Sequence, residues 1–222
     1  LSGLSSLTDL GCNLASDVPP SQAASILSAL PGLRRLCLFG NRSTPDAAKS
    51  RTPQSLSGAD HASRVEHLEL SCCDNTISAL ALPKLRELGL SGNSVGWVDL
   101  PRLLRVSSAL ESLRLCDASF VDDDMLLSTL KRLPRLQCLR LWRCRQLTSK
   151  AVFAVASTSP SLHKLSIRGC GLGLAEVIIS VVSVFVDQIP HLEALDLDLS
   201  RAHAFAGLLN RLRAAFPHLL IE

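Results

Sequence analysis

Thiol and imidazole groups that could act together occur in the first third of the chain. Cys37, His67 and Cys72 could form a thiolate–imidazole pair, with Glu69 orienting the imidazole. No glycine-rich phosphate loop, nucleophile elbow or metal-binding histidine pair accompanies them. The spacing is also poor for zinc, because Cys72 adjoins Cys73 and no Cys-x-x-Cys occurs. The sequence favours chance proximity, and it predicts no catalysis, no metal site and no cofactor.

A second group of side chains is basic and aromatic. Arg140 and Arg143 flank Trp142, and further basic residues occur about one repeat earlier, at Arg114, and one later, at Lys164 and Arg168. Tryptophan and arginine often dominate binding energy at protein interfaces, because both offer large contact areas and arginine adds forked hydrogen bonds. Whether these side chains share one surface depends on the elements that carry them.

A repeated nine-residue pattern carries both groups. Residues 136–144 and 162–170 each have apolar residues at the first, fourth and sixth positions and a cysteine at the ninth. Alternation of apolar and polar residues has the period of a strand with one buried face. Residues 147–157, between the copies, offer a polar start and a helix-compatible apolar run. The pattern predicts a unit of strand, turn and helix.

Copies of this unit run along the whole chain. One unit cannot bury its own apolar face, so each needs a neighbour of the same kind. The other copies begin at Leu7, Leu33, Val65, Leu85, Leu110, Leu192 and Leu219, and those at Leu7, Leu192 and Leu219 are weaker.

The units resemble leucine-rich repeats. Residues 144–162 are similar to the cysteine-containing subclass of F-box-type and ribonuclease-inhibitor-like proteins, in which a Cys or Asn closes the strand and a Leu-Thr-Asp turn follows. Ser149 stands where Asp is usual. The resemblance implies an α/β solenoid of about eight repeats in a single domain over 1–222, an open horseshoe with parallel strands on its concave face and helices on its convex face. It implies the fold far better than the function.

The third, fifth, seventh and eighth positions of each strand pattern point away from the core, onto the predicted concave face. One interpretation is that an acidic peptide or protein surface docks there around Trp142, with Asp196 and Asp198 fixing its register. The alternative is a solvated charged face, with Trp142 lying across arginine stems in cation–π contact. The residues assigned to binding are Phe39, Arg114, Arg140, Trp142, Arg143, Lys164 and Arg168.

Composition agrees with a leucine-based core. Hydrophobic residues make up 47% of the 222 residues, Tyr is absent, and the net charge of +3 gives only a weak argument for a polyanionic partner. The eight cysteines do not pair in terminal caps, so we expect free thiols in a reducing, intracellular compartment, the cytoplasm or an organelle interior. Cys144 and Cys170 are expected on adjacent strands, where a bridge stays geometrically open.

Three other segments have distinctive composition. Residues 42–64 are polar with two Thr-Pro steps and predict an inserted loop, with Thr44 or Thr52 as candidate phosphorylation sites. Asp122, Asp123 and Asp124 precede an apolar run and predict a helix start rather than a cation site. Residues 174–189 predict an apolar helix whose charged residues leave too short a span for a membrane.

These observations favour a non-catalytic protein-interaction module that binds an acidic surface around Trp142. A second hypothesis is a structural subunit or assembly factor of a large multiprotein complex. Helix 174–189 and the uncapped ends would then be its contacts, and we expect these ends to be truncated or covered by a partner. A third, implied by the resemblance, is the substrate-recognition part of a ubiquitin ligase, although no F-box-like segment lies within the 222 residues. Nucleic acid is a lesser possibility, because the basic patch is small.

Overall fold

The computed structural model describes residues 6–14, 29–40, 64–71, 82–92, 100, 104, 107–171, 188–189, 191–197, 206–215 and 217–221. Its contacts divide the chain into two compact units, Leu1–Leu110 and Glu111–Glu222. Each unit is built from the same repeat and is described by itself. The prediction of one repeat domain over 1–222 stays a prediction.

Unit 1 contains parallel strands that follow one another in chain order, each hydrogen-bonded to the next. Leucines at alternate positions, such as Leu68 and Leu70 of the third strand, are almost fully buried on one side of the sheet. The residues between them lie on the other side, because successive side chains of a strand point to opposite faces. The strands are β1 (Asp9–Leu14), β2 (Arg35–Gly40), β3 (His67–Ser71) and β4 (Glu87–Ser91).

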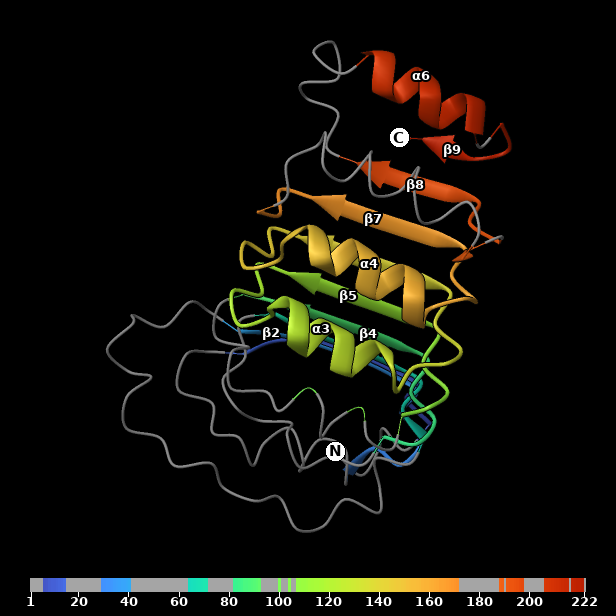
Figure 1. The fold of residues 1–222 in the computed structure, drawn as a ribbon. Helices are drawn as coiled ribbons and strands as arrows, with labels where there is room; N and C mark the ends of the chain where they lie inside the picture. Colours follow the sequence, from blue (N-terminus) through green and yellow to red (C-terminus); the bar gives the residue numbers. More distant parts are fainter. Residues whose placement is uncertain are drawn as a thin grey trace. The chain divides into compact units, whose positions relative to one another are not determined.

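Unit 2 repeats this arrangement and adds helices. Helices α3 (Asp123–Leu130) and α4 (Ser149–Thr158) lie side by side over one face of the sheet (Figure 1), and α6 (Ala206–Ala215) lies between the last two strands in the sequence. Leu139 and Leu141, fully buried, belong to the core under the helices. The parallel strands, again in chain order, are β5 (Ser112–Cys116), β6 (Cys138–Trp142), β7 (Lys164–Arg168), β8 (Ala194–Leu197) and β9 (Leu220–Ile221).

The aspartates before α3 start the helix and tie it to the next repeat. The Asp122 side chain accepts a hydrogen bond from the Met125 amide at 2.8 Å, which satisfies an otherwise unpaired helical N–H. The Asp123 carboxylate accepts bonds from the amide and the hydroxyl of Thr148, at 2.9 and 2.5 Å, and Thr148 in turn caps α4. The predicted helix start is therefore confirmed.

Cysteines at the ninth position of two repeats contact the backbone of the preceding strand. The Cys144 thiol lies 3.5 Å from the Leu115 carbonyl oxygen, and the Cys170 thiol lies 3.3 Å from that of Leu141. The hydrogen bond that the two thiols share, together with burial, raises the pKa of Cys144. The six cysteines of the described residues are all free thiols.

The prediction of an α/β leucine-rich repeat solenoid is confirmed, with a strand at every expected copy of the pattern. The predicted loop 42–64, apart from Arg64, and most of the predicted helix 174–189 lie outside the described residues, as do Thr44, Thr52, Cys72 and Asp198. None of the helices in the described ranges has the length and apolar character needed to cross a bilayer.

Candidate functional site

The strand register of unit 2 brings the predicted basic residues onto one face of the sheet. Arg114 lies beside Arg140, and Trp142 lies beside Arg168 on the next strand. Neighbouring strands are about 4.8 Å apart, so side chains from β5 to β7 share a surface about 10 Å wide. We call this surface the tryptophan patch, defined as Arg114, Arg140, Trp142, Arg143, Lys164 and Arg168.

Hydrogen bonds hold the indole of Trp142 in place. Its Nε1–H donates to Ser166 Oγ at 2.8 Å, and the Ser166 hydroxyl donates to Asp196 Oδ2, also at 2.8 Å. Ser166 is only 5% exposed although it lies on the outer face of the sheet. Residues of three strands therefore hold one partly buried tryptophan through hydrogen bonds.

Asp196 also fixes a guanidinium of the patch. Arg168 Nε donates to Asp196 Oδ1 at 2.6 Å, and Nη2 forms an ion pair with the same oxygen. Both carboxylate oxygens of Asp196 are thus engaged within the protein. This carboxylate positions Arg168 and, through Ser166, Trp142. That Asp196 fixes the register of a partner stays a prediction.

Arg143 has an unusual backbone conformation. Its φ is +55°, and Asp117, at the same repeat position one strand earlier, has a φ of +53°. Glycine occupies this position at Gly92 and Gly169, also with positive φ. A left-handed conformation costs a residue other than glycine roughly 1–2 kcal/mol. The repeat thus carries an arginine and an aspartate where glycine would fit without strain.

The Asp117 carboxylate accepts a hydrogen bond from Arg143 Nη2 at 2.7 Å. A Cβ atom added to Gly169 would lie 3.2 Å from Arg143 Cγ, so the bare backbone of this glycine leaves room for the arginine stem. The Arg143 side chain remains 64% exposed. The strained backbone therefore places the Arg143 guanidinium at the carboxyl end of β6. There it is hydrogen-bonded to Asp117 and still open to solvent.

Arg140 and Lys164 differ from Arg143 and Arg168. Within the described ranges neither of them forms an ion pair, and the Lys164 side chain is exposed. The patch contains five basic residues, of which Arg143 and Arg168 pair with Asp117 and Asp196. The positive charges of Arg140 and Lys164, which have no ion pair among the described residues, would attract acidic side chains.

Phe39 belongs to unit 1, whereas the tryptophan patch belongs to unit 2. It is on β2 of unit 1, next to Asn13 and Ser71 in the register, and is 39% exposed. No register in the described residues places it beside a member of the patch.

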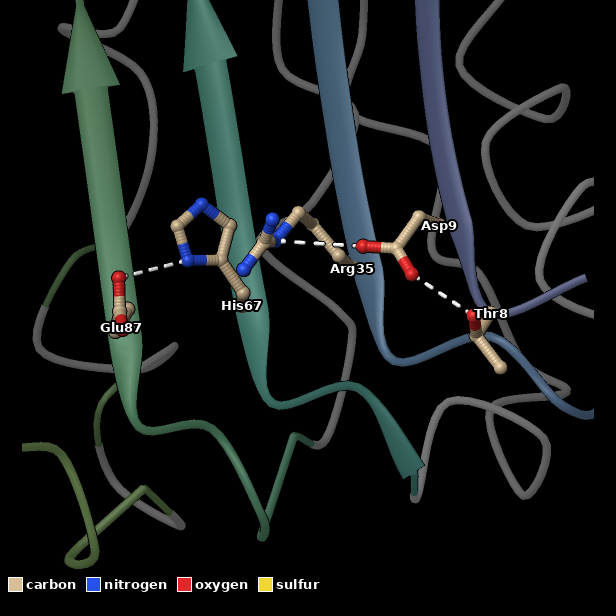
Figure 2. Close-up of polar contacts among 5 residues, drawn as sticks. All are labelled: Thr8, Asp9, Arg35, His67 and Glu87. Atoms are coloured by element: carbon tan, nitrogen blue, oxygen red, sulfur yellow. Dashed lines mark hydrogen bonds and ion pairs between the residues drawn. The ribbon is translucent and has the colours of Figure 1, made fainter.

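Charged residues also cross the sheet of unit 1, as Figure 2 shows. Thr8 donates to Asp9, Asp9 forms a 3.5 Å ion pair with Arg35, and His67 Nδ1 lies 2.8 Å from Glu87 Oε2. The predicted orienting residue of His67 was Glu69, so the identity of this carboxylate was wrong. It is supplied by the next strand, because the register places His67 directly beside Glu87.

Cys37, His67 and Glu69 form a cluster whose possible ligand atoms all lie within 4.8 Å of one another. Burial raises the pKa of the Cys37 thiol, and the negative charge of Glu69 raises it further. A thiol held in its protonated form is a poor nucleophile. This electrostatic setting gives no support to a thiolate–imidazole catalytic pair.

Sequence reasoning did not identify Ser166 or the pairing of Asp117 with Arg143. Ser166 stands at the same repeat position as Arg140, and Asp117 at the same position as Arg143, so alignment of the repeats would have marked both as residues of the outer face. Their roles depend on side-chain rotamers and on a positive φ, which spacing alone does not specify.

The comparisons with known proteins agree with this architecture. Residues 25–195 match the family model described as FBD-associated F-box protein At5g56370, LRR repeats. No curated protein was found to match the chain by sequence.

Among solved structures, the chain is similar to the leucine-rich repeat-containing protein LegL7 from Legionella pneumophila. The TM-score is 0.52 and the sequence identity 17%, over 97% of this chain and 82% of that one. A likeness at this identity concerns the fold alone. Since the family model spans well over half of the residues, the chain belongs to the leucine-rich repeat family of FBD-associated F-box proteins.

Proposed function

We propose that this chain is a non-catalytic protein-interaction module that binds an acidic segment of a partner protein on the tryptophan patch. One observation carries the proposal: the Trp142–Ser166–Asp196 hydrogen bonds hold a partly exposed indole among five basic side chains. A preorganised aromatic loses little conformational entropy on binding, and the surrounding cations would pair with carboxylates of the partner.

The role of each residue follows from its contacts. Trp142 provides apolar contact area, while Arg140 and Lys164, with no ion pair in the described ranges, would meet the partner's carboxylates first. Arg143 and Arg168 are already held by Asp117 and Asp196, so they would act as fixed donors at the end of the patch. Arg114 extends the surface by one strand.

Phe39 is a separate case within the same proposal. It is an exposed aromatic on the sheet face of unit 1, and it would provide apolar contact area to a partner. Its contribution is expected to be smaller, because neither a hydrogen bond nor a basic neighbour on an adjacent strand fixes it in the described residues.

A peptide selection followed by calorimetry would test the proposal. Random twelve-residue peptides displayed on phage are selected on the purified chain, and enriched sequences are titrated into the wild type and Trp142→Ala/Arg140→Glu. The matched control is Phe153→Ala/Lys150→Glu, which makes the same two changes on exposed residues of α4, on the other side of the sheet.

The proposal expects enriched peptides to be acidic, and to lose at least 30-fold in affinity with the first variant while keeping the affinity of the control. Circular dichroism would establish that both variants are folded. Enrichment of neutral or basic peptides, or equal affinity for the wild type and the Trp142 variant, would contradict it.

A second candidate function is substrate recognition within a ubiquitin ligase, favoured by the match to repeats of an F-box protein. In that case the tryptophan patch would hold the acidic segment of the substrate. The test is whether a partner identified through the patch becomes more abundant in cells when the patch is mutated. An unchanged half-life of that partner would contradict this role.

A further inference from the structure

The cluster of Cys37, His67 and Glu69 on unit 1 combines three types of side chain that bind transition metals. Cys37 of β2 lies beside Glu69 of β3, and His67 lies two residues before Glu69 on the same face. Their possible ligand atoms all lie within 4.8 Å of one another. In a tetrahedral zinc site, bonds of about 2.0–2.3 Å place ligand atoms about 3.3–3.8 Å apart, so modest side-chain rotation would close the site.

The hydrogen bond from His67 prepares its ring for a metal. Glu87 Oε2 is a carboxylate oxygen, which accepts hydrogen bonds when ionised, so in a neutral ring this contact favours the tautomer with the proton on His67 Nδ1 and the lone pair on Nε2. Figure 2 shows that this second nitrogen points away from Glu87, toward the arrowhead of β3. Glu69 comes two residues after His67 on the same strand, and Cys37 lies beside Glu69 in the register. Metal-binding histidines usually make such a second-shell bond, which fixes the tautomer and the orientation of the ring.

Glycines on the neighbouring strands leave space around the cluster. Gly11 lies beside Cys37, and a Cβ atom added there would meet nothing within 4 Å. Gly89 lies beside Glu69, and a Cβ atom there would lie 3.3 Å from Glu69 Cγ, so the carboxylate stem occupies the room that a side chain would need. An ion could therefore approach the sheet face, and water could fill its fourth coordination position.

The charge around the cluster also suits a cation. Arg35, the nearest basic residue in the register, is paired with Asp9 at 3.5 Å. Glu69 and Glu87 contribute two carboxylates, and coordination would convert the Cys37 thiol to a thiolate with release of its proton. The mixed sulfur, nitrogen and oxygen donor set favours zinc over magnesium or calcium, which prefer oxygen ligands alone.

We propose that Cys37, His67 and Glu69 bind one zinc ion on the sheet face of unit 1, with Glu87 as the second-shell partner of His67. Sequence spacing argued against a zinc site because the ligands come from two repeats rather than from a Cys-x-x-Cys motif. The proposal is independent of the tryptophan patch, which lies in unit 2.

Cobalt substitution is the most direct test, because tetrahedral Co²⁺ with a thiolate ligand gives charge-transfer and ligand-field absorption bands. The metal-free chain is titrated with Co²⁺ and then with Zn²⁺ under reducing conditions. We expect saturation at one Co²⁺ per chain and loss of the bands as Zn²⁺ displaces it.

Variants assign the bands to the cluster. Cys37→Ser should abolish the thiolate band, His67→Gln should prevent tetrahedral binding, and Glu87→Gln should weaken zinc affinity about 10–100-fold. Cys138→Ser is the matched control, since Cys138 is a partly exposed cysteine on the sheet face of unit 2, beside Ser112 and Lys164. It should leave the spectrum unchanged.

Three results would overturn the proposal: no saturable Co²⁺ band, a band that survives Cys37→Ser, or a band that is lost with Cys138→Ser. Circular dichroism of each metal-free variant would separate loss of the site from loss of the fold. Should Cys37→Ser fail to fold, the assignment of the Co²⁺ bands would rest on His67→Gln and Glu87→Gln. Zinc affinity that is undiminished in both of these variants would equally refute the site.

Discussion

The sheet faces of the two units have the same geometry and different chemistry. In unit 1 the third position of each repeat carries a polar residue, and these residues form two pairs, Asp9 with Arg35 and His67 with Glu87. In unit 2 the basic residues of the tryptophan patch stand mostly at later positions of the repeat, such as Arg114 and Arg140, and Asp117 and Asp196 pair with Arg143 and Arg168. The same parallel register therefore carries a row of paired charges in one unit and a mainly basic surface in the other.

This difference teaches that the repeat determines position, while the residues between the buried leucines determine function. Leu36, Leu68 and Leu88 in unit 1 are as buried as Leu113 and Leu139 in unit 2. The outer residues therefore differ between the units while the buried leucines stay the same. Our proposals place an acidic protein segment on one face and a zinc ion on the other.

The largest expected effect is on stability, and it separates the buried leucines, which form the framework of the repeats, from the residues of the outer sheet face. Leu139→Ala removes a fully buried side chain of β6, and the cavity should lower the free energy of unfolding by about 2–5 kcal/mol. The neighbouring change Arg140→Ala should alter it by less than about 0.5 kcal/mol. Urea denaturation followed by circular dichroism measures both. Similar losses for the two variants would show that the outer column is part of the framework.

A somewhat smaller effect is expected on peptide binding when one aromatic of each face is replaced. Trp142→Ala should weaken the binding of an acidic peptide by about 2 kcal/mol, roughly 30-fold, because a fixed contact surface is lost. Phe39→Ala should weaken this binding less. Calorimetry with one peptide and both variants gives the ratio. A greater loss for Phe39 would move the main binding surface to unit 1.

The next effect concerns how repeats of unit 2 are joined. Asp123→Ala removes the acceptor of two hydrogen bonds from Thr148, and it should lower the free energy of unfolding by about 1–2 kcal/mol. Asp124, an exposed acid in the same helical turn, provides the control, and its replacement by alanine should cost less than about 0.5 kcal/mol. Equal costs in thermal denaturation would assign the effect to helix charge rather than to the contact with Thr148.

The smallest effect is on the reactivity of Cys37. Its raised pKa means that, at neutral pH without metal, the folded chain has a smaller thiolate fraction than the unfolded chain. Alkylation of Cys37, followed by peptide mass spectrometry with a chelator present, should therefore accelerate at a higher pH in the folded chain than in urea. A folded profile with its midpoint at lower pH would point to an activated thiol and reopen the catalytic hypothesis.

The sequence was sufficient to predict the strands and the columns of the sheet faces. Every described strand but β9 lies at an apolar-x-x-apolar-x-apolar pattern, and Arg140 and Trp142 are on the face to which alternation assigned them. The register of β9 is one residue earlier than a copy beginning at Leu219 would give, since Leu220 lies beside Ala194. This succeeds because burial of alternate leucines requires one register, and a shift by one residue would expose all of them.

Side-chain contacts were predictable only in part. His67 pairs with Glu87 rather than Glu69, and Trp142 donates to Ser166, because rotamers choose among several neighbours that the register brings within reach. The positive φ of Arg143 was not predicted from the sequence either, although Gly169, at the equivalent position of the next repeat, marks where the backbone becomes left-handed. Repeat alignment could find such positions, but the contacts that hold them depend on three-dimensional packing.

The indole N–H signal of Trp142 in a nitrogen–proton correlation spectrum tests the central claim most directly. The chain has two tryptophans, so Trp142→Phe would assign the signal. During titration with a selected acidic peptide, the account predicts that this signal shifts progressively and saturates with the binding constant measured by calorimetry, while a basic peptide leaves it unmoved. An indole signal that stays in place while the acidic peptide binds would contradict the proposed role of the tryptophan patch.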